Sequence, residues 1–373
     1  MHRQTRVQFA AYVSQIALLN SVSVADVSTK FAVDPTVEQK LEERMKESSE
    51  FLSSVNLVPV IQQSGDKVGI EATRSIAGRT DTSGGTKRNP TDPTDTTAQH
   101  GYFCRQTNYD WAIRYAKLDA WRHKANFQEL LRNAILKQQG RDRIMIGWNG
   151  TSAASTTDRD ANPLLQDVNK GWLQHVREDA PAHVLDDGSL TVKSDKTDNP
   201  ALKAIYVKAG VTLYDESLDN SDTGEADYSS LDSLVLDAKS LIEEWHRGDT
   251  GLVVIVGHDL VDEKYFNIAQ KTGATATEVE AMDRIIRSDK QLGGLPAVRV
   301  PFFPANAIMI TRLDNLSIYW QEETRRRMIK DEPEADRIAN FESVNEDYVV
   351  EEYDMAALVE NIVIGAAPAR PAA

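Results

Sequence analysis

The sequence predicts a mixed α+β protein that carries one long extended hairpin. Two segments, residues 68–73 and 109–115, alternate apolar and polar side chains with the period of 2 that is typical of strands with one buried face. An apolar stripe at helical spacing runs over residues 127–146, and a series of short apolar strands follows residue 295. Together these observations indicate the α+β class.

The hairpin is predicted from a polar stretch that separates the two strand-like segments. Between Arg79 and His100 the chain runs for 22 residues without one Val, Ile, Leu, Met, Phe, Tyr or Trp. An extended chain from Val68 to the Gly84-Gly85 pair reaches up to roughly 50 Å, whereas a compact chain of this length has a radius of gyration near ~21 Å. An isolated ribbon is marginal in water, so we expect another copy of the protein to support it. A disordered linker between two domains is the alternative, and composition leaves both open.

The N-terminal third is predicted to hold two helices and a strand. Residues 1–30 form a small helical unit that is set apart by a Ser-rich stretch, and a second helix follows Pro35. A strand over residues 56–61 then leads into the hairpin. After the hairpin, residues 127–146 form one amphipathic helix, ended by Gly147 and Gly150, that is long enough to act as a spine.

The C-terminal half is predicted to hold an α/β module and a set of short strands. The module spans residues 228–287, where Ser229 and Asp232 resemble a capping box and an apolar stripe that includes Trp245 precedes the buried strand of residues 251–257. Two further helices complete the module. From Leu295 onward short strands return a sheet to the region of the spine.

Length and composition are those of an ordinary globular chain. Its 373 residues correspond to one large domain or two to three ordinary ones, and a hydrophobic content of 41% is enough to bury a core. The longest aliphatic run, residues 252–256, is far shorter than the ~20 residues of a membrane helix, and the N-terminus lacks an apolar signal-peptide core. We therefore expect a soluble protein, made in the cytoplasm, without a membrane partner. Cys104 is the only cysteine, which excludes an internal disulfide and a thiolate-rich metal site and favours a small core residue.

The net charge of −15 argues against a nucleic-acid-binding surface over the whole molecule, because such proteins need a basic face. Much of the charge is local, since residues 321–354 contain 12 acidic and five basic side chains. A solvated face is the usual interpretation of such a segment. The sharper one is that Arg325, Arg326, Arg327 and these carboxylates meet opposite charge on neighbouring subunits.

The search for catalytic motifs finds none in a usable context, so we expect no catalytic, cofactor-binding or metal-ligating residue. His258 and Asp259 follow a buried strand, where an α/β enzyme can place catalytic groups, but a helix N-cap role is the stronger interpretation without a nucleophile motif. Glu243, Glu244 and His246 indicate a solvated helix end rather than a metal site. Residues 152–155 indicate a loop, and residues 121–124 indicate helix packing with a polar flank.

A series of blocks in one order resembles a known family across nearly the whole chain. These blocks are RVQFAAYVSQIALLN, DVSTKFAVDPTVEQKL, ESSEFL, VNLVPV, TDTSGGTKR, NYDWAIRY, NAILKQQGRDRIMIGWNG, NPLLQDVNKGWLQ, GLVVIVG, LPAVRVPFFPANAIMIT, LDNLSIYW and NEDYVVEEY. In this order they resemble the major capsid protein of the P-two-like myophages. The resemblance implies the tailed-phage capsid fold named after the Hong Kong phage.

That resemblance divides the chain into six parts. It implies a scaffold-like segment at 1–31, an N-terminal arm at 32–63, an extended loop at 64–116, a peripheral domain with the spine helix at 117–200, an axial domain at 201–294, and return strands of the peripheral domain with a tail at 295–373. The spine would pack through Phe127, Leu131 and Ile135. The tip of the extended loop would make intersubunit contacts through Asp81, Gly84, Gly85, Lys87 and Arg88.

The resemblance also implies a life cycle. Copies would assemble as pentamers and hexamers into an icosahedral procapsid in the host cytoplasm, on an internal scaffold that supplies a maturation protease, with a portal protein at one vertex. The protease would cut at about Phe31-Ala32, and the mature virion would enclose double-stranded DNA without reading its sequence. Some relatives of the broader fold cross-link the extended loop through a lysine, but for Lys87 a subunit contact is the better expectation.

Two other classes of function stay open at this stage. One is a cytoplasmic α/β hydrolase built on residues 228–287, which would need a cleft that holds His258 with a partnered serine or carboxylate. The other is a scaffold or adaptor that binds the head without forming it. Rings or shells made by the purified chain would distinguish a shell subunit from both.

Overall fold

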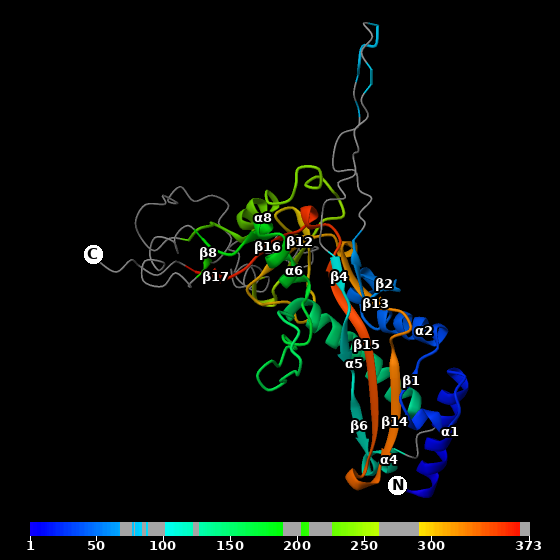
Figure 1. Ribbon diagram of the computed structural model, residues 1–373. Coiled ribbons are helices and arrows are strands. Elements are labelled where there is room, and N and C mark those ends of the chain that lie inside the picture. Colours follow the sequence, from blue (N-terminus) through cyan, green and yellow to red (C-terminus); the bar gives the residue numbers. More distant parts are fainter. Residues whose placement is uncertain are drawn as a thin grey trace, which may run out of the picture.

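The structure is a computed structural model that describes residues 1–67, 77, 79–83, 87–88, 101–121, 127–188, 203–208, 226–260 and 291–365. Figure 1 shows an elongated molecule in which long strands occupy one end and a second, smaller sheet lies beside their other end. The N-terminus lies at the end formed by the long strands. Within the described part of the chain, the two larger sheets have seven and six strands.

The seven-stranded sheet is organised around one long strand, β15, which spans Arg337–Val350. One half of β15 pairs with β14 and the other half with β13, both antiparallel. β5 and β6 also pair with β15, and β2 extends the sheet in parallel beyond β13. The partners of β15 and the outer strands are β1 (Phe31–Ala32), β2 (Asn56–Val60), β5 (Arg105–Asn108), β6 (Trp111–Arg114), β13 (Leu316–Gln321) and β14 (Arg326–Glu332).

Three helices precede residue 64, and local signals in the sequence explain where they begin. α1 spans Arg3–Leu19 and α2 spans Pro35–Lys46, where the Asp34 side chain accepts a hydrogen bond from the Thr36 amide and proline takes the first helical position. α3 is the short helix Glu50–Ser54. The predicted helices at 1–30 and after Pro35 are therefore confirmed, as is the strand that follows them.

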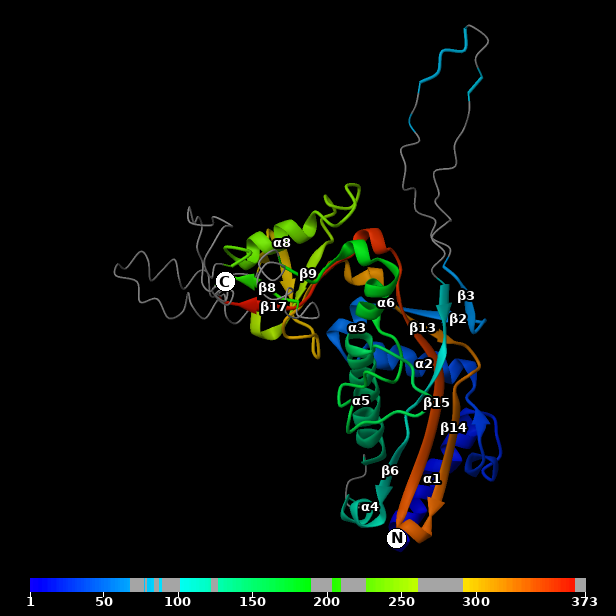
Figure 2. The same cartoon turned by 60° about the vertical axis from the view of Figure 1, so that its left-hand side comes forward.

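The spine helix α5 spans Phe127–Asn149 and runs alongside β6 and β15 (Figure 2). The prediction that Gly147 helps to end it is wrong. Gly147 lies inside the helix because α6 (Trp172–Asp179) crosses there, and a Cβ atom at this position would lie 2.3 Å from Cζ3 of Trp172. The helix ends at Gly150, whose Cβ would lie 2.1 Å from the carbonyl oxygen of Asn169.

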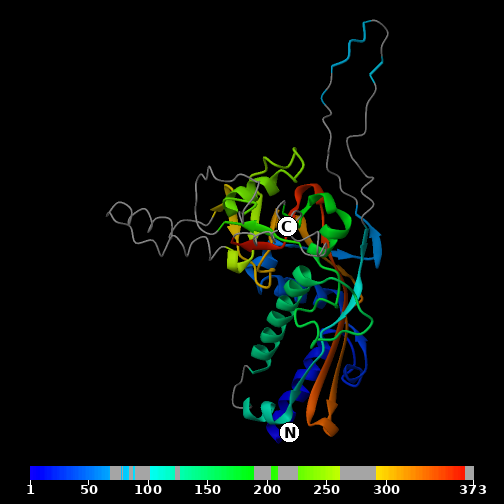
Figure 3. The same ribbon diagram turned by 90° about the vertical axis from the view of Figure 1, so that its left-hand side faces the viewer.

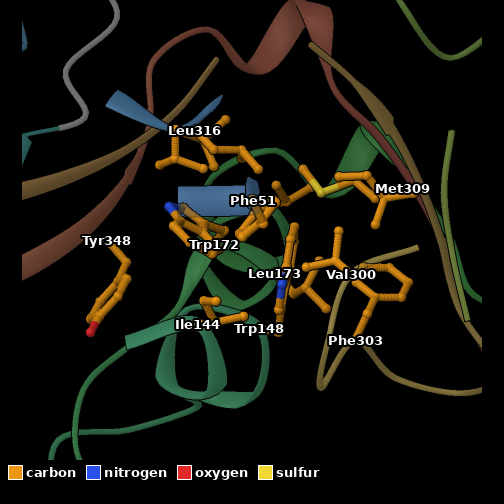
Figure 4. Packing of buried hydrophobic residues seen from close by; sticks show 14 of the residues in the cluster. Phe51, Ile144, Trp148, Trp172, Leu173, Val300, Phe303, Met309, Leu316 and Tyr348 are labelled. Carbon is orange, nitrogen blue, oxygen red and sulfur yellow. The ribbon is translucent and has the colours of Figure 1, made fainter. Parts of the chain in front are cut away.

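The main core forms where the spine, α6 and both sheets meet. Trp148 and Trp172 pack edge to face with ring centroids 4.9 Å apart, and Phe51, Phe303 and Tyr348 surround them at centroid distances of 5.0–6.0 Å. Figure 4 shows these rings beside aliphatic side chains from the spine and from the strands of both sheets. Edge-to-face aromatic pairs stabilise a core beyond their buried area, so this cluster fixes the two sheets around the end of the spine.

The second sheet has the strand order β10-β11-β9-β12-β16-β7, and α8 (Leu231–Lys239) packs against it. Figure 3 shows α8 and this sheet beyond the end of α5 that is remote from α4. Its strands are β7 (Val184–Leu185), β9 (Val253–Val256), β10 (Gln291–Leu292), β11 (Leu295–Val298), β12 (Ile308–Thr311) and β16 (Ala357–Val359), and β8 (Ile205–Val207) pairs separately with β17 (Ile362–Ile364).

Three predictions about this half of the chain are wrong. The strands after Leu295 do not form one sheet, because β11, β12 and β16 join the buried strand β9 and only β13, β14 and β15 join the long sheet. The capping box uses Ser230 and Ser233, one position after the predicted pair. Trp245 does not extend the apolar stripe, because α8 ends at Lys239 and the Trp245 side chain is 69% exposed. The two helices predicted before residue 287 lie outside the described residues.

The base of the predicted hairpin is a short ladder between β3 (Ser64–Asp66) and β4 (Gly101–Phe103). The described residues 79–83 and 87–88 are drawn apart from the body in all three views (Figures 1, 2 and 3). The strand predicted at 68–73 lies outside the described residues. The segment 109–115 was expected to return along the hairpin, but Trp111–Arg114 pairs with β15, because Ile113 is buried against the long sheet. We call residues 64–103 the arm.

Short elements join these parts. α4 (Tyr115–Trp121) follows β6 at the end of the long strands. Single turns of 3-10 helix occur at Asp26–Ser28, Pro181–His183, Leu313–Asn315, Pro333–Ala335 and Tyr353–Met355. Cys104 lies between β4 and β5, and its side chain is buried as predicted.

Replacing Gly147 by alanine tests the crossing of α5 and α6. The added Cβ would enter the Trp172 ring, so we expect Gly147→Ala to lower the free energy of unfolding by roughly 1–3 kcal/mol. Gly248→Ala is the matched control, because nothing lies within 4 Å of a Cβ built there. Urea unfolding of the unassembled chain, followed by tryptophan fluorescence, measures both variants. Equal stability of the two would show that the helices do not cross this closely.

Candidate assembly surfaces and the buried ion network

The most unusual feature of the long sheet is a network of buried charges between the spine, α2 and β15. It contains two arginines, Arg143 and Arg325, and the four carboxylates of Glu38, Glu42, Glu342 and Glu346. All six side chains are at most 7% exposed. We call this set the ion network.

Glu42 of α2 is the centre of the ion network. Nη2 of Arg143 donates to its Oε1 atom at 3.0 Å, and Nη2 of Arg325 donates to the same oxygen. Arg143 also reaches Glu346 with an Nε–Oε2 distance of 2.8 Å, while Arg325 donates to Glu342. The network therefore joins the spine, α2, β15 and the segment that precedes β14.

The acidic segment 321–354 was expected to be solvated or to face other subunits. For Arg325, Glu342 and Glu346 both expectations are wrong, because these side chains are buried in ion pairs of their own chain. Arg325 is fully buried, and it forms ion pairs with Glu38, Glu42 and Glu342 of the same chain. The segment contains the central strand β15, which was missed because its charges mask the alternation of strand residues. A signal was nevertheless present. Glu38 and Glu42 are spaced to share one helix face, and Glu342 and Glu346 are spaced to share one strand face.

Burial of the ion network shifts the pKa values of its carboxyl groups. Burial raises the pKa of Glu38 to about 7, although Arg325 opposes the shift. Burial also raises the pKa of Glu346, against the attraction of Arg143. Burial acts in the same direction on Glu42, but Arg143 and Arg325 outweigh it and hold the pKa of this carboxyl below its ordinary value. Glu38 is thus a carboxyl group whose protonation changes near neutral pH.

The pKa of Glu38 predicts a pH dependence of stability with a definite sign. Its folded-state pKa of about 7 lies above the ordinary value of 4.5, so the folded protein binds this proton more tightly than the unfolded chain. Its contribution to stability is fully present below pH ~4.5 and is lost as the pH rises through ~7. Glu38→Gln mimics the protonated form, so we expect the variant to gain stability over wild type between pH 5 and pH 8.

Urea unfolding of the unassembled chains at several pH values measures this difference. Glu243→Gln, at an exposed position, is the control and should show no such trend. A difference between Glu38→Gln and wild type that stays constant from pH 5 to pH 8 would show that Glu38 does not bind the proton.

Removing one of the two buried arginines should disrupt the ion network. Arg325→Met would remove the buried cation that Glu38 and Glu342 contact and would leave Glu42 with Arg143 alone. We expect it to lower the free energy of unfolding by about 3–5 kcal/mol. Arg326→Met removes the same charge at an exposed neighbouring position and should change stability by no more than about 0.5 kcal/mol. Chemical unfolding of both variants makes the comparison. Two equally mild variants would mean that Arg325 is not paired in the interior.

A second polar site, which sequence reasoning missed, surrounds the base of the arm. We call it the arm root; it contains Lys67, Phe103, Asp179, Asp347 and Tyr353. Nζ of Lys67 donates to the carbonyl oxygen of Val350 at 2.5 Å and lies 4.4 Å from the ring centroid of Tyr353. Beside it, the hydroxyl of Tyr353 donates to Asp179 at 2.6 Å. The amide of Phe103 donates to Asp347 at 2.9 Å. Both strands of the arm base are thus attached to the end of β15 and the segment that follows it.

His175 on α6 adds a positive charge to this root. Its Nδ1 atom lies 3.4 Å from Asp179, and its Nε2 atom lies 3.9 Å from Asp347. Burial works against protonation, but the two carboxylates outweigh it and raise the pKa of His175 to about 9. The imidazolium therefore persists at neutral pH and holds α6, β15 and the arm root together.

The structure describes three of the five residues predicted at the tip of the arm. Asp81, Lys87 and Arg88 are exposed, while Gly84 and Gly85 lie outside the described residues. The Asp81 side chain accepts a hydrogen bond from the amide of Ser83 at 2.9 Å, so it forms a local turn.

The first half of the spine is less buried than its stripe suggests. Phe127 begins α5, but its side chain lies outside the described residues. Leu131 and Ile135 are half-buried and line a cavity of about 90 Å³ between α1 and α5. Leu130 is 52% exposed, and Ala134 is also exposed. Full burial begins at the second half of the spine, where Ile144 and Ile146 enter the core.

The Phe31-Ala32 junction lies in β1, which pairs antiparallel with β14. Phe31 faces Arg327 in the ladder, and its side chain is 8% exposed in an apolar cluster with Ile16, Ala17 and Val27. The unit of residues 1–30 is therefore helical as predicted, but it packs on the long sheet rather than standing apart.

The residues considered for chemistry stay separate. The side chain of His258 is 73% exposed and lies 3.4 Å from that of its neighbour Asp259. Among the described residues, no group of three or more His, Cys, Asp or Glu side chains has the arrangement of a metal site. In the same residues, no helix has the length and apolar character needed to cross a membrane.

Comparisons with known proteins decide the family. A model of the phage major capsid protein of the P2 family matches residues 8–362. The chain belongs to this family. It is 46% identical over 366 residues to the capsid protein of Escherichia phage P2, covering 98% of this chain and 96% of that protein. It is 41% identical over 364 residues to the major capsid protein of Serratia phage KSP20, covering 97% of each chain.

A solved structure supports the same conclusion about the fold. A chain of the satellite phage P4 procapsid, a particle that includes the size determination (Sid) protein, is 44% identical with a TM-score of 0.75. The match covers 98% of this chain and 99% of that chain. The predicted P-two-like family, α+β tailed-phage capsid fold and shell function are confirmed, and the hydrolase alternative is not supported. As a virion capsid protein, the chain forms an icosahedral shell with its own copies.

Proposed function

We propose that the chain assembles as pentamers and hexamers into a procapsid that encloses double-stranded DNA without reading its sequence. Membership of the P2 capsid family over residues 8–362 is the observation that carries this proposal. The net charge of −15 supports it, because a wall that bound packaged DNA tightly would hinder its movement. Function then resides in subunit geometry, and the chain carries no catalytic activity.

The proposed partners follow from the family. An internal scaffold with a maturation protease removes residues 1–31, a portal protein occupies one vertex, and assembly takes place in the host cytoplasm before the shell becomes part of the virion. The placement of Phe31 and Ala32 in a short strand, after a helical unit, is compatible with such a junction. The scaffold or adaptor alternative loses support, because the matching family forms the shell itself.

The arm supplies contacts between subunits in this proposal. Its base is fixed by Lys67 and Phe103 to the body, while the described residues 79–83 and 87–88 lie apart from that body. Residues 79–100 of the arm contain no Val, Ile, Leu, Met, Phe, Tyr or Trp, so they can contribute almost nothing apolar to a core of their own chain. An element that is anchored at its root and polar at its tip is suited to lie on a neighbouring copy.

Deleting residues 81–97 and closing the gap with a short turn tests the arm. We expect the body to stay folded, because the deleted residues bury little apolar surface, but assembly should fail or give fragile, misshapen particles. Circular dichroism and thermal melting report on the unassembled subunit, and sedimentation reports particle yield after coexpression with the scaffold. A scrambled version of residues 81–97, equal in length and composition, separates the effect of sequence from that of reach. Normal, stable shells from a folded deletion variant would refute the arm as an intersubunit element.

A further inference from the structure

The bond between Phe31 and Ala32 is shielded by the segment that its cleavage would release. Phe31 and Val33 point their side chains into the structure and are 8% and 4% exposed, whereas Ala32 between them is exposed. The Val33 amide donates to the carbonyl oxygen of Arg325 at 2.9 Å, and the Asp34 amide donates to the Asn20 side chain at 3.1 Å. The junction is therefore extended, but the side chains of Phe31 and Val33 are buried and the amides of Val33 and Asp34 already have acceptors.

An endoprotease needs these same groups. An extended peptide is recognised through its main-chain hydrogen bonds and through pockets that take alternate side chains. Neither the side chain of Phe31 nor that of Val33 can enter a pocket while it lies in the apolar cluster, and β14 already pairs with the backbone of residues 31 and 32. Cleavage in the docked state is therefore blocked by packing rather than by distance.

We propose that residues 1–34 form a latch, so that the Phe31-Ala32 bond is cut only after this unit has left the long sheet. The inference rests on the processing that is part of the proposed function, and it concerns the regulation of that step. Hydrolysis breaks the C–N bond between the two residues, and water supplies the hydroxyl of the new Phe31 carboxyl group and a proton to the new Ala32 amine. The latch decides when a protease can reach this bond.

Besides the pairing of β1 with β14, two contacts that leave the scissile bond itself untouched help to hold the latch closed. The first is apolar, because Ile16, Ala17, Val27 and Phe31 pack on Ile113, Ile329 and Ile338 of the sheet, and opening would expose both faces to water. The second is polar and lies at the start of α1. There the Asp119 side chain accepts hydrogen bonds from the His2 amide at 2.9 Å and from the Thr5 hydroxyl at 2.6 Å. Each contact can be weakened without touching the scissile bond.

Chymotrypsin, which cleaves after aromatic residues, can serve as the probe on the full-length unassembled chain. When opening is fast relative to cleavage, the rate follows the population of the open form. We expect the wild-type product that begins at Ala32 to appear at least roughly tenfold more slowly than the same cut in a synthetic peptide of residues 24–38. Mass spectrometry of the products counts only chains that begin at Ala32, so cuts elsewhere do not interfere.

Variants that weaken these contacts distinguish a bond that becomes accessible when the latch opens from a bond that is never accessible in the folded chain. Ile16→Ala should accelerate this cut roughly tenfold or more, because the residue is buried in the latch. Val7→Ala lies on the same helix at a position that is 65% exposed, and it should cut at the wild-type rate. Asp119→Asn loosens the other end and should accelerate the cut several-fold even if Ile16→Ala folds poorly, with melting of the body checked in each case. Equal rates in wild type, Ile16→Ala and Asp119→Asn, or a wild-type rate equal to that of the peptide, would overturn the latch.

The processing itself is tested separately by intact-mass analysis of mature particles. Chains that begin at Ala32 support the proposed processing whatever the chymotrypsin rates show. Chains that retain residues 1–30 would refute the processing, and with it the role of the latch, even where chymotrypsin finds the bond shielded. Failure of the one proposal is thus distinguishable from failure of the other.

Discussion

The long sheet depends on the way in which two buried arginines hold four carboxylates. Arg143 comes from the spine and Arg325 from the segment before β14, and both bind Glu42 of α2. A buried ion pair adds little net stability, because the cost of removing charges from water offsets their attraction. It mainly destabilises other packing arrangements of the same elements, since any arrangement that separates the two partners leaves a buried charge unpaired. The ion network therefore specifies how α2 and the spine sit on β15 more than it stabilises them.

The same strand joins the two halves of the molecule. β15 leaves the long sheet at Val350, and the chain enters the second sheet at β16. The other crossing, from β12 to β13, lies beside it, where the Asn315 side chain donates to the Glu352 carbonyl oxygen at 2.8 Å and accepts from the Glu352 amide at 2.8 Å. Lys67 binds Val350 at the start of this crossing. The base of the arm is therefore attached directly beside the two places where the chain passes between the sheets.

Sequence reasoning was reliable where burial followed apolar pattern, and it failed where charge or tertiary contact decided the structure. Local signals in the sequence were sufficient to predict the helix after Pro35, the buried strand β9 and one long helix for the spine. β15 was missed because Glu342 and Glu346 are buried, and single-sequence patterns treat such residues as exposed. The pairing of β6 with β15 and the position of Gly147 depend on contacts with residues distant in sequence, which periodicity does not reveal.

The candidate surfaces show a related limit. The family resemblance led to Phe31 and to the arm tip, but only the structure places Phe31 in a core cluster and Lys67 at the arm root. Several large apolar side chains stay exposed in one subunit, among them Ile61 at 82% and Phe103 at 46%, and both lie at the base of the arm. In a protein that forms a shell with its own copies, burial in one subunit describes only part of the final packing. Other exposed apolar side chains, such as Leu18 at 80% and Trp245 at 69%, lie elsewhere in the chain, so the apolar surface that one subunit leaves open is spread over several parts of the chain.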